Sequence, residues 1–394
     1  MRSDGAGAAE AGAAGAAAPV KPARKERDPF FDNAKFLAIL LVVVGHALGS
    51  LLNVPLAKGV YMFIYMFHMP LFIVITGYFS RNWTFSSGKA RKLITTVGVP
   101  YVIFETAYSL YAWLVNGGEL KISLLDPYYL TWFLCALFLW RLSTPVWQQI
   151  RWPLAVALVI SLLSYMTTMG GLLDIHRVVG LVPFYVLGLM LKPEHFEIIK
   201  KPMVRVLGIL LLVAAFGLSF LTMDRMAKGW VYWNTSSDHL GVSNLTGLAM
   251  RLAMFTCAIV LLFSFLAIVP RRRTWFTALG AYTLYAYLLH GFLTKAISFA
   301  GLRKVDAVAS PAGVLALIAL SLLVGTLLCT PPVVRCTSWL LEPKLDRVFT
   351  KLRRPTPKRP TPRHAADPNG ATATDGTATT PSVDKITVGA ESRR

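Results

Sequence analysis

Apolar residues along this chain gather in long runs separated by short polar segments. A helix of roughly 20 mostly apolar residues crosses a bilayer core, and runs of about that length recur. The runs lie at about 34–52, 59–79, 93–115, 126–142, 152–169, 174–191, 204–222, 244–269, 276–298 and 312–334. The pattern predicts an all-α integral membrane protein with about ten transmembrane helices and no internal repeat.

The two ends of the chain differ from this central region. Residues 1–28 are rich in Ala and Gly and end in a basic segment, whereas residues 346–394 are rich in Pro, Thr, Arg and Gly. Such compositions bury too little apolar surface to offset the entropy of ordering. We therefore expect a membrane domain over 29–345 between two disordered tails, the second of them basic.

Positive charges predict the orientation, because short cytoplasmic loops carry an excess of Lys and Arg. One alternate set of internal loops holds thirteen such residues and the other holds seven. Both tails fall on the side with thirteen, so both termini are expected in the cytoplasm and the protein in the plasma membrane. This topology explains the net charge of +20 better than nucleic-acid binding does.

Composition excludes several classes of protein. Charged residues make up 15% of the 394 residues, against about 25% in soluble domains. This excludes a secreted soluble protein, a cytosolic enzyme and a disordered chain. The four cysteines, Cys135, Cys257, Cys329 and Cys336, show no metal-ligand spacing, so neither a metal site nor a disulfide is expected.

The first apolar run carries two polar residues on one face. Asp32 and Asn33, residue types that favour helix N-caps, stand at its start, and Lys35 and His46 follow, eleven residues apart. At 100° and 1.5 Å per residue, these two side chains share a face with an axial separation of roughly 16 Å. We expect Lys35 at the cytoplasmic edge and His46 at or beyond mid-membrane. The alternative is a packing histidine with an interfacial lysine.

Other polar residues fall at a similar predicted depth. His68, Glu105, Arg251 and His290 lie within predicted spans, and at about 1.5 Å per residue they fall with His46 between the middle and the outer half of the membrane. Ionisable groups in a membrane are costly and mark functional sites, so we expect a shared polar cavity. A Glu105–Arg251 pair that only holds helices together is the alternative.

The ninth run carries a polar stripe. Thr283, Tyr287, His290 and Thr294 recur at i, i+4, i+7 and i+11, a spacing that places side chains on one face of a helix. The opposite face is apolar. The stripe therefore lines either a cavity or a helix contact, and His290 favours the cavity.

A basic cluster follows the second run. Arg81, Lys89, Arg91 and Lys92 lie in one predicted cytoplasmic loop. Arg and Lys side chains bind phosphates. The positive-inside rule accounts for the same residues without a ligand, so both interpretations remain open.

Three strings of residues carry a family resemblance. They are DNAKFLAILLVVVGH, which ends at His46, FHMPLFIVITGYF over 67–79, and LGAYTLYAYLLH, which ends at His290. Together they resemble the integral-membrane acyltransferase-3 family and, within it, the branch similar to fucose 4-O-acetylases. YYLTWFL over 128–134 and the RK…P run over 91–100 are weaker matches. Lys35 stands where many members carry Arg, and Thr76 and Thr283 replace Ser.

The resemblance implies transfer of an acyl group, with acetyl expected, from acyl-CoA to a hydroxyl of a carbohydrate or glycan-like acceptor. CoA is then a donor substrate, and no permanently bound cofactor is expected. The resemblance also implies that CoA binds at the cytoplasmic side. The candidates to hold it are Lys35, Arg81, Arg91 and Lys92.

His46 is the expected catalytic residue. A neutral imidazole deprotonates a hydroxyl as general base, or it attacks the thioester and carries the acyl group itself; both routes remain open. The residues expected to orient His46 are His68, Glu105 and His290. Arg251 is expected to stabilise an oxyanion or hold the acceptor, and Tyr287 to bind substrate.

Two other functions are consistent with the same pattern. A transporter or flippase of a sugar or glycolipid also places polar groups at the membrane midplane, although the chain shows no paired broken helices and no repeat. A non-catalytic membrane partner that anchors an assembly through its tails predicts that substitutions of the histidines are tolerated. Acyl transfer is the function that the resemblance favours.

Overall fold

The computed structural model describes residues 27–117, 119–301 and 305–343. Throughout these ranges the regular structure is helical and no strand occurs. The predicted all-α integral membrane fold is therefore confirmed. Apart from residues 27 and 28, the predicted tails, 1–28 and 346–394, lie outside the described residues.

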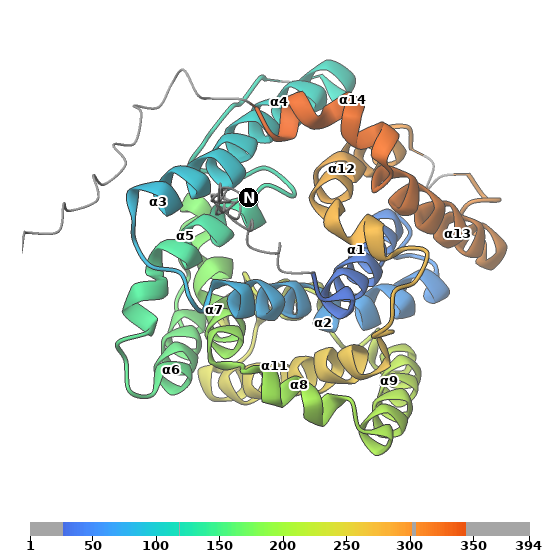
Figure 1. Cartoon of the computed structure of the whole chain (residues 1–394). Helices are drawn as coiled ribbons and strands as arrows, with labels where there is room; N and C mark the ends of the chain where they lie inside the picture. Colours follow the sequence, from blue (N-terminus) through green and yellow to red (C-terminus); the bar gives the residue numbers. More distant parts are fainter. Residues whose placement is uncertain (1–26, 118, 302–304, 344–394) are drawn as a thin grey trace, which may run out of the picture. The chain divides into compact units, whose positions relative to one another are not determined.

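The helices follow one another along the chain, and Figure 1 labels all of them except α10. In the described ranges they are α1 (Pro29–Leu48), α2 (Pro55–Ser80), α3 (Ser87–Leu93), α4 (Val99–Asn116), α5 (Trp132–Trp147), α6 (Pro153–Tyr165), α7 (Ile175–Met190), α8 (Pro193–Ile199), α9 (Pro202–Thr222), α10 (Lys228–Tyr232), α11 (Asn244–Ile268), α12 (Thr283–Phe299), α13 (Pro311–Leu328) and α14 (Pro331–Leu341). A π-helical turn over Ile94–Gly98 joins α3 to α4.

Seven helical segments in the described part of the chain are long and apolar enough to cross a membrane. They are α1, α2, the α3–α4 segment, the segment that ends with α7, α9, α11 and α13. The other three predicted spans coincide with α5, α6 and α12, which have 16, 13 and 17 residues. These helices are roughly 20–26 Å long, shorter than a bilayer core, so the ten crossings and the cytoplasmic termini stay predictions.

Two of the long helices present apolar side chains to the outside of the protein. Of the most apolar 18-residue stretch of each helix, only 11% is buried in α9 and 17% in α13. Leu207, Leu221 and Leu323 are among their exposed residues. Soluble proteins rarely expose apolar surfaces this extensive, so these faces fit contact with lipid.

α1 begins earlier than its sequence predicted. Asp28 is the N-cap, and its carboxylate accepts a 2.9 Å hydrogen bond from Phe30 N. Asp32 and Asn33, which we expected at the start, lie inside the helix and are buried. Asn33 Nδ2 donates to Pro270 O at 2.8 Å and so attaches α1 to the segment that follows α11. Asn33 therefore joins two elements, whereas the sequence suggested a cap.

α1, which carries His46, packs on α2, α12 and α13 (Figure 1). α2 in turn crosses α7 at two glycines that allow close approach. A Cβ on Gly77 would lie 2.2 Å from Tyr185 O, and one on Gly188 would lie 2.3 Å from Val74 O. These contacts bring side chains from four helices around the final turns of α1.

Candidate active site

A cavity of about 330 Å³ lies at the end of α1. Helices α1, α2, α7 and α12 form its wall, together with the segment before α5 and the residues around the end of α10. It is lined by His46, Gly49, Ser50, Tyr61, Tyr65, His68, Met69, Tyr129, Leu130, Trp132, Arg177, Leu181, Val231, Tyr232, Trp233, Tyr287, Thr294, Lys295 and Ser298. Aromatic rings and polar groups thus predominate, and no carboxylate from the described residues lines this cavity.

His46 is held by a chain of hydroxyl groups. Its Nδ1 lies 3.1 Å from the hydroxyl of Tyr129, which lies 2.8 Å from Oγ1 of Thr294. Thr294 Oγ1 in turn donates to Gly291 O at 3.1 Å. The two hydroxyls thereby connect the imidazole of α1 to the backbone of α12.

The last member of this chain fixes the direction of every hydrogen bond in it. A carbonyl oxygen only accepts, so the Thr294 hydroxyl donates to Gly291 O and accepts from Tyr129. The Tyr129 oxygen is then left to accept from Nδ1–H of His46. This arrangement selects the neutral tautomer of His46 whose Nε2 carries a lone pair. Such a nitrogen is suited to act as a base or a nucleophile.

The structure brings two further predicted histidines close to His46. His68 lines the cavity, and its Nδ1 donates to Ile64 O at 2.8 Å. His290 is fully buried, its Nδ1 donates to Ala286 O at 2.9 Å, and its ring centroid lies 5.3 Å from that of His46. Nε2 of His290 is buried without a hydrogen-bond partner among the described residues. Tyr287, also predicted, lines the cavity beside them.

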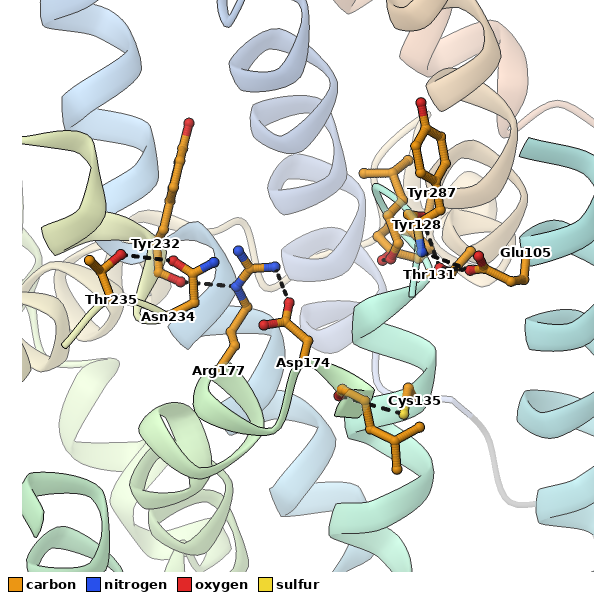
Figure 2. Close-up of polar contacts among 12 residues, drawn as sticks. Glu105, Tyr128, Thr131, Cys135, Asp174, Arg177, Tyr232, Asn234, Thr235 and Tyr287 are labelled. Carbon is orange, nitrogen blue, oxygen red and sulfur yellow. Dashed lines mark hydrogen bonds and ion pairs between the residues drawn. The ribbon is translucent and has the colours of Figure 1, made fainter. Parts of the chain in front are cut away.

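Glu105 lies outside this cavity, on α4. Its Oε2 accepts hydrogen bonds from Tyr128 N at 2.8 Å and from Thr131 Oγ1 at 2.5 Å (Figure 2). These two residues flank Tyr129, whose φ of 59° is rare for a non-glycine residue. The Tyr287 hydroxyl donates to Leu130 O in the same segment. Glu105 therefore anchors the loop that carries Tyr129, and it makes no contact with His46.

Arg251 also lies outside the cavity. Its guanidinium stacks over the rings of Tyr165 and Trp233, at 4.2 and 4.7 Å from their centroids. One nitrogen donates to Thr235 O at 3.5 Å. Trp233 lines the cavity, so Arg251 packs behind a cavity residue. The alternative of a Glu105–Arg251 pair that holds helices together is not seen among the described residues, because each side chain has other partners.

Three of the cavity residues that were not among the predicted site residues bear on its chemistry: Tyr129, Arg177 and Lys295. Tyr129 belongs to the string YYLTWFL, and Lys295 directly follows the polar stripe of α12, so both had a weak signal. Arg177 was counted in a loop, but it lies in the first turn of α7. There it pairs with Asp174 at 2.6 Å and donates to Tyr232 O at 3.0 Å (Figure 2).

Two further cavities extend from the His46 cavity toward the start of α1. A middle cavity of about 270 Å³ shares Met69 and Tyr287 with the His46 cavity. A terminal cavity of about 660 Å³ shares Lys35 and Phe79 with the middle one. Because neighbours share wall residues, the three cavities follow one another along α1 from its first turn to His46.

The predicted basic residues divide between this series of cavities and the surface. Lys35 lines the middle and terminal cavities and pairs with Asp32 at 2.7 Å. Arg81 lines the terminal cavity, with its guanidinium 4.0 Å from the ring centroid of Tyr78. Arg91 and Lys92 lie on α3 and line none of the three cavities described above. No group of three or more potential metal ligands occurs among the described residues.

The fold and this cavity define a multi-pass membrane protein with a buried histidine site. The family model described as "Acyltransferase domain" (Acyl_transf_3) matches residues 28–330. The chain therefore belongs to this family and is a membrane acyltransferase.

One curated relative shares a limited segment with the chain. Nodulation protein NolL of Mesorhizobium japonicum is 33% identical over 105 residues, and the match covers 26% of each chain. The chain thus spans about a quarter of that relative's length. No solved structure matches the chain.

Proposed function

We propose that this protein moves an acetyl group from acetyl-CoA to a hydroxyl of a carbohydrate or glycan-like acceptor, with His46 as the reacting residue. The proposal includes its assignment to the branch similar to fucose 4-O-acetylases and its location in the plasma membrane. The observation that carries it is the series of cavities from Lys35 to His46. A linear donor with an anionic head and a reactive tail fits that series.

The donor enters from the basic end. The phosphates of CoA bind at the terminal cavity, whose lining holds three cations, Arg27, Lys35 and Arg81, against the two carboxylates of Asp28 and Asp32. Arg91 and Lys92 on α3 add to the positive charge of this side. The pantetheine arm occupies the middle cavity, whose lining is mainly apolar. Lys35 and His46 are roughly 16 Å apart along α1, which brings the thioester to the imidazole.

In the first route, His46 is a general base. Nε2 removes the proton of the acceptor hydroxyl, and the oxygen attacks the thioester carbonyl carbon. A C–O bond forms and the C–S bond breaks. The CoA thiolate then takes the proton from the imidazolium, which restores neutral His46. Tyr129 keeps Nδ1–H engaged throughout, because its oxygen faces that atom.

In the second route, His46 carries the acetyl group. Nε2 attacks the thioester carbonyl carbon, the C–S bond breaks, and CoA leaves as thiolate while His46 becomes an acetyl-imidazolium that keeps Nδ1–H. The acceptor hydroxyl then attacks the acetyl carbon, the C–N bond breaks to restore neutral His46, and the hydroxyl proton passes to the thiolate. The hydrogen bond from Nδ1 to Tyr129 serves this route equally well. Labelled acetyl-CoA supplied without acceptor separates the two, because only the second route leaves label on His46.

The test of the proposed function uses sealed membrane vesicles with the cytoplasmic face outward. We expect CoA release from acetyl-CoA and O-acetylation of a supplied cell-envelope glycan fraction, both absent from vesicles that lack the protein. A transporter would instead accumulate unmodified glycan without any need for acetyl-CoA. Accumulation of that kind, with no release of CoA, would overturn the proposal.

A further inference from the structure

Two cations line the His46 cavity, Arg177 from α7 and Lys295 from α12. No carboxylate from the described residues lines the same cavity. Ionisable side chains are costly at membrane depth and are usually retained for function. The cavity thus offers positive charge to a ligand, in addition to the neutral groups around His46.

Lys295 is held by aromatic faces alone. Its Nζ lies 4.5 Å from the ring centroid of Tyr129 and 4.7 Å from that of Tyr128. No ion pair to Lys295 occurs within the described residues. A lysine held in this way has its three N–H donors available to the cavity.

Arg177 is fixed in orientation by two partners. Nη1 pairs with Asp174 and Nε donates to Tyr232 O, and the guanidinium lies 4.5 Å from the ring centroid of Trp132. These contacts use two of its three nitrogens. The two polar contacts, drawn in Figure 2, fix the planar group, which lines the cavity, as a preorganised site for an anion requires.

Both cations lie away from the proposed donor entrance. On α12, Thr283 lines the middle cavity and Lys295 the His46 cavity, and twelve residues of helix separate them by roughly 18 Å. The phosphates of CoA remain at the basic terminal cavity in the proposed function. Arg177 and Lys295 therefore face the other substrate.

We infer that the acceptor is an acidic carbohydrate, whose carboxylate or phosphate is held by Lys295 and Arg177 while its hydroxyl faces His46. This inference rests on the proposed function. The stacked rings of Tyr61 and Tyr65, 3.9 Å apart, provide an apolar face for the sugar ring in the same cavity. Aromatic faces and fixed cations together suit an acidic sugar better than a neutral one.

A different use of the same cations is to stabilise the oxyanion that forms on the thioester carbonyl. The two uses differ in kinetics. Oxyanion stabilisation acts in the transition state with every acceptor, so its loss lowers kcat for neutral and acidic acceptors alike. Binding of an acceptor anion acts only on acidic acceptors and appears mainly in KM.

The experiment measures kcat/KM for matched acceptor pairs with purified full-length protein in proteoliposomes. The pairs are methyl glucoside against methyl glucuronide, and methyl galactoside against methyl galacturonide, with glucose 1-phosphate and galactose 1-phosphate as the phosphate arm. Charged hydrogen bonds in a desolvated site predict roughly a tenfold to hundredfold preference for the acidic member of at least one pair. A preference for the glucuronide or galacturonide indicates a site for a carboxylate, and a preference for a sugar 1-phosphate indicates a site for a phosphate.

Substitution of Lys295 tests the assignment. K295M is expected to raise KM for the preferred acidic acceptor about tenfold more than KM for its neutral partner, and K295R is expected to restore much of the preference. The matched control is K58M, because Lys58 lies outside the cavity and pairs with the exposed Asp224.

Three outcomes overturn the inference: no acidic preference in any pair, a preference that survives in K295M, or an equal fall in kcat for acidic and neutral acceptors. Acetyl-CoA turnover that depends on His46 is measured in parallel. Turnover that persists without acidic preference overturns this inference alone. Absence of His46-dependent turnover removes the proposed function as well.

Discussion

At the scale of single residues, the direction of the hydrogen bonds, more than their number, determines which nitrogen of His46 carries the proton. The chain from His46 through Tyr129 and Thr294 ends on a carbonyl, which leaves one consistent set of proton positions. A carboxylate usually orients a catalytic imidazole. In the proposed function two hydroxyl groups perform that role, and no carboxylate from the described residues lines the cavity, where it would repel an acidic acceptor.

Removal of one hydroxyl tests this arrangement. Y129F keeps the ring but removes the acceptor for Nδ1–H, so the two tautomers of His46 become mixed. We expect kcat for acetyl transfer to fall roughly 10- to 100-fold, with KM for acetyl-CoA unchanged. Y111F is the control, because Tyr111 packs only on rings of α12. Full activity of Y129F would show that His46 needs no such partner.

The sequence predicted part of the site at this scale. His46, His68, His290 and Tyr287 do lie together, because their helices turn these faces toward one another. Glu105 was placed at the same depth, yet it faces another cavity. Depth along a helix fixes only one coordinate, and the rotation of each helix about its axis depends on packing that a single sequence does not reveal.

At the scale of elements, the segment between α4 and α5 holds a strained residue of the site. Tyr129 has a positive φ, and such strain persists only where neighbouring contacts determine the backbone. Glu105 of α4 and Tyr287 of α12 supply those contacts on either side. Two helices, α4 and α12, thus each hold one part of the loop that carries Tyr129.

Substitutions of Glu105 separate an anchoring role from the catalytic role that the sequence suggested. E105A leaves Tyr128 N–H without an acceptor, which we expect to cost about 1–3 kcal/mol of stability and to lower kcat. E105Q keeps one acceptor oxygen and should retain most of both. The measurements are thermal unfolding in detergent and CoA release. Equal inactivation by E105Q and E105A, at unchanged stability, would make Glu105 catalytic.

Helix ends were harder to predict than helix positions. Every predicted span coincides with a helix, because runs of apolar residues are a strong signal. The start of α1 was misplaced because Asp32 and Asn33 are also good capping residues. Asn33 instead bonds from inside the helix to the segment after α11. The sequence did not show where the loops beside α5, α6 and α12 begin, so the short lengths of these helices were not predicted.

At the scale of the whole molecule, the three cavities connect a basic end to a histidine site across most of α1. This arrangement separates the anionic head of a donor from the reacting group. A short thioester would not need the whole series. The length of the cavities therefore predicts a difference between full and truncated donors.

A block in the middle cavity tests that difference. Thr76 lines the middle cavity, and T76W should fill much of it. We expect acetyl-CoA turnover to fall roughly tenfold or more, whereas S-acetyl-N-acetylcysteamine, which lacks the nucleotide, should be used nearly as well as by wild type. L218W on the exposed face of α9 is the control. Equal losses with both donors would contradict passage through this cavity.

The most direct test of the central claim concerns His46 itself. Inside-out vesicles that hold equal amounts of wild type, H46A or H195A receive labelled acetyl-CoA and a glycan acceptor fraction, and release of CoA is followed. His195 is the control because it lies on the short helix α8, where its Nδ1 accepts from Lys192 N, and it lines none of the three cavities along α1. We predict that H46A loses at least about a hundredfold in rate while it still binds acetyl-CoA, and that H195A resembles wild type. An H46A protein that is folded and turns over acetyl-CoA at the wild-type rate would contradict the account.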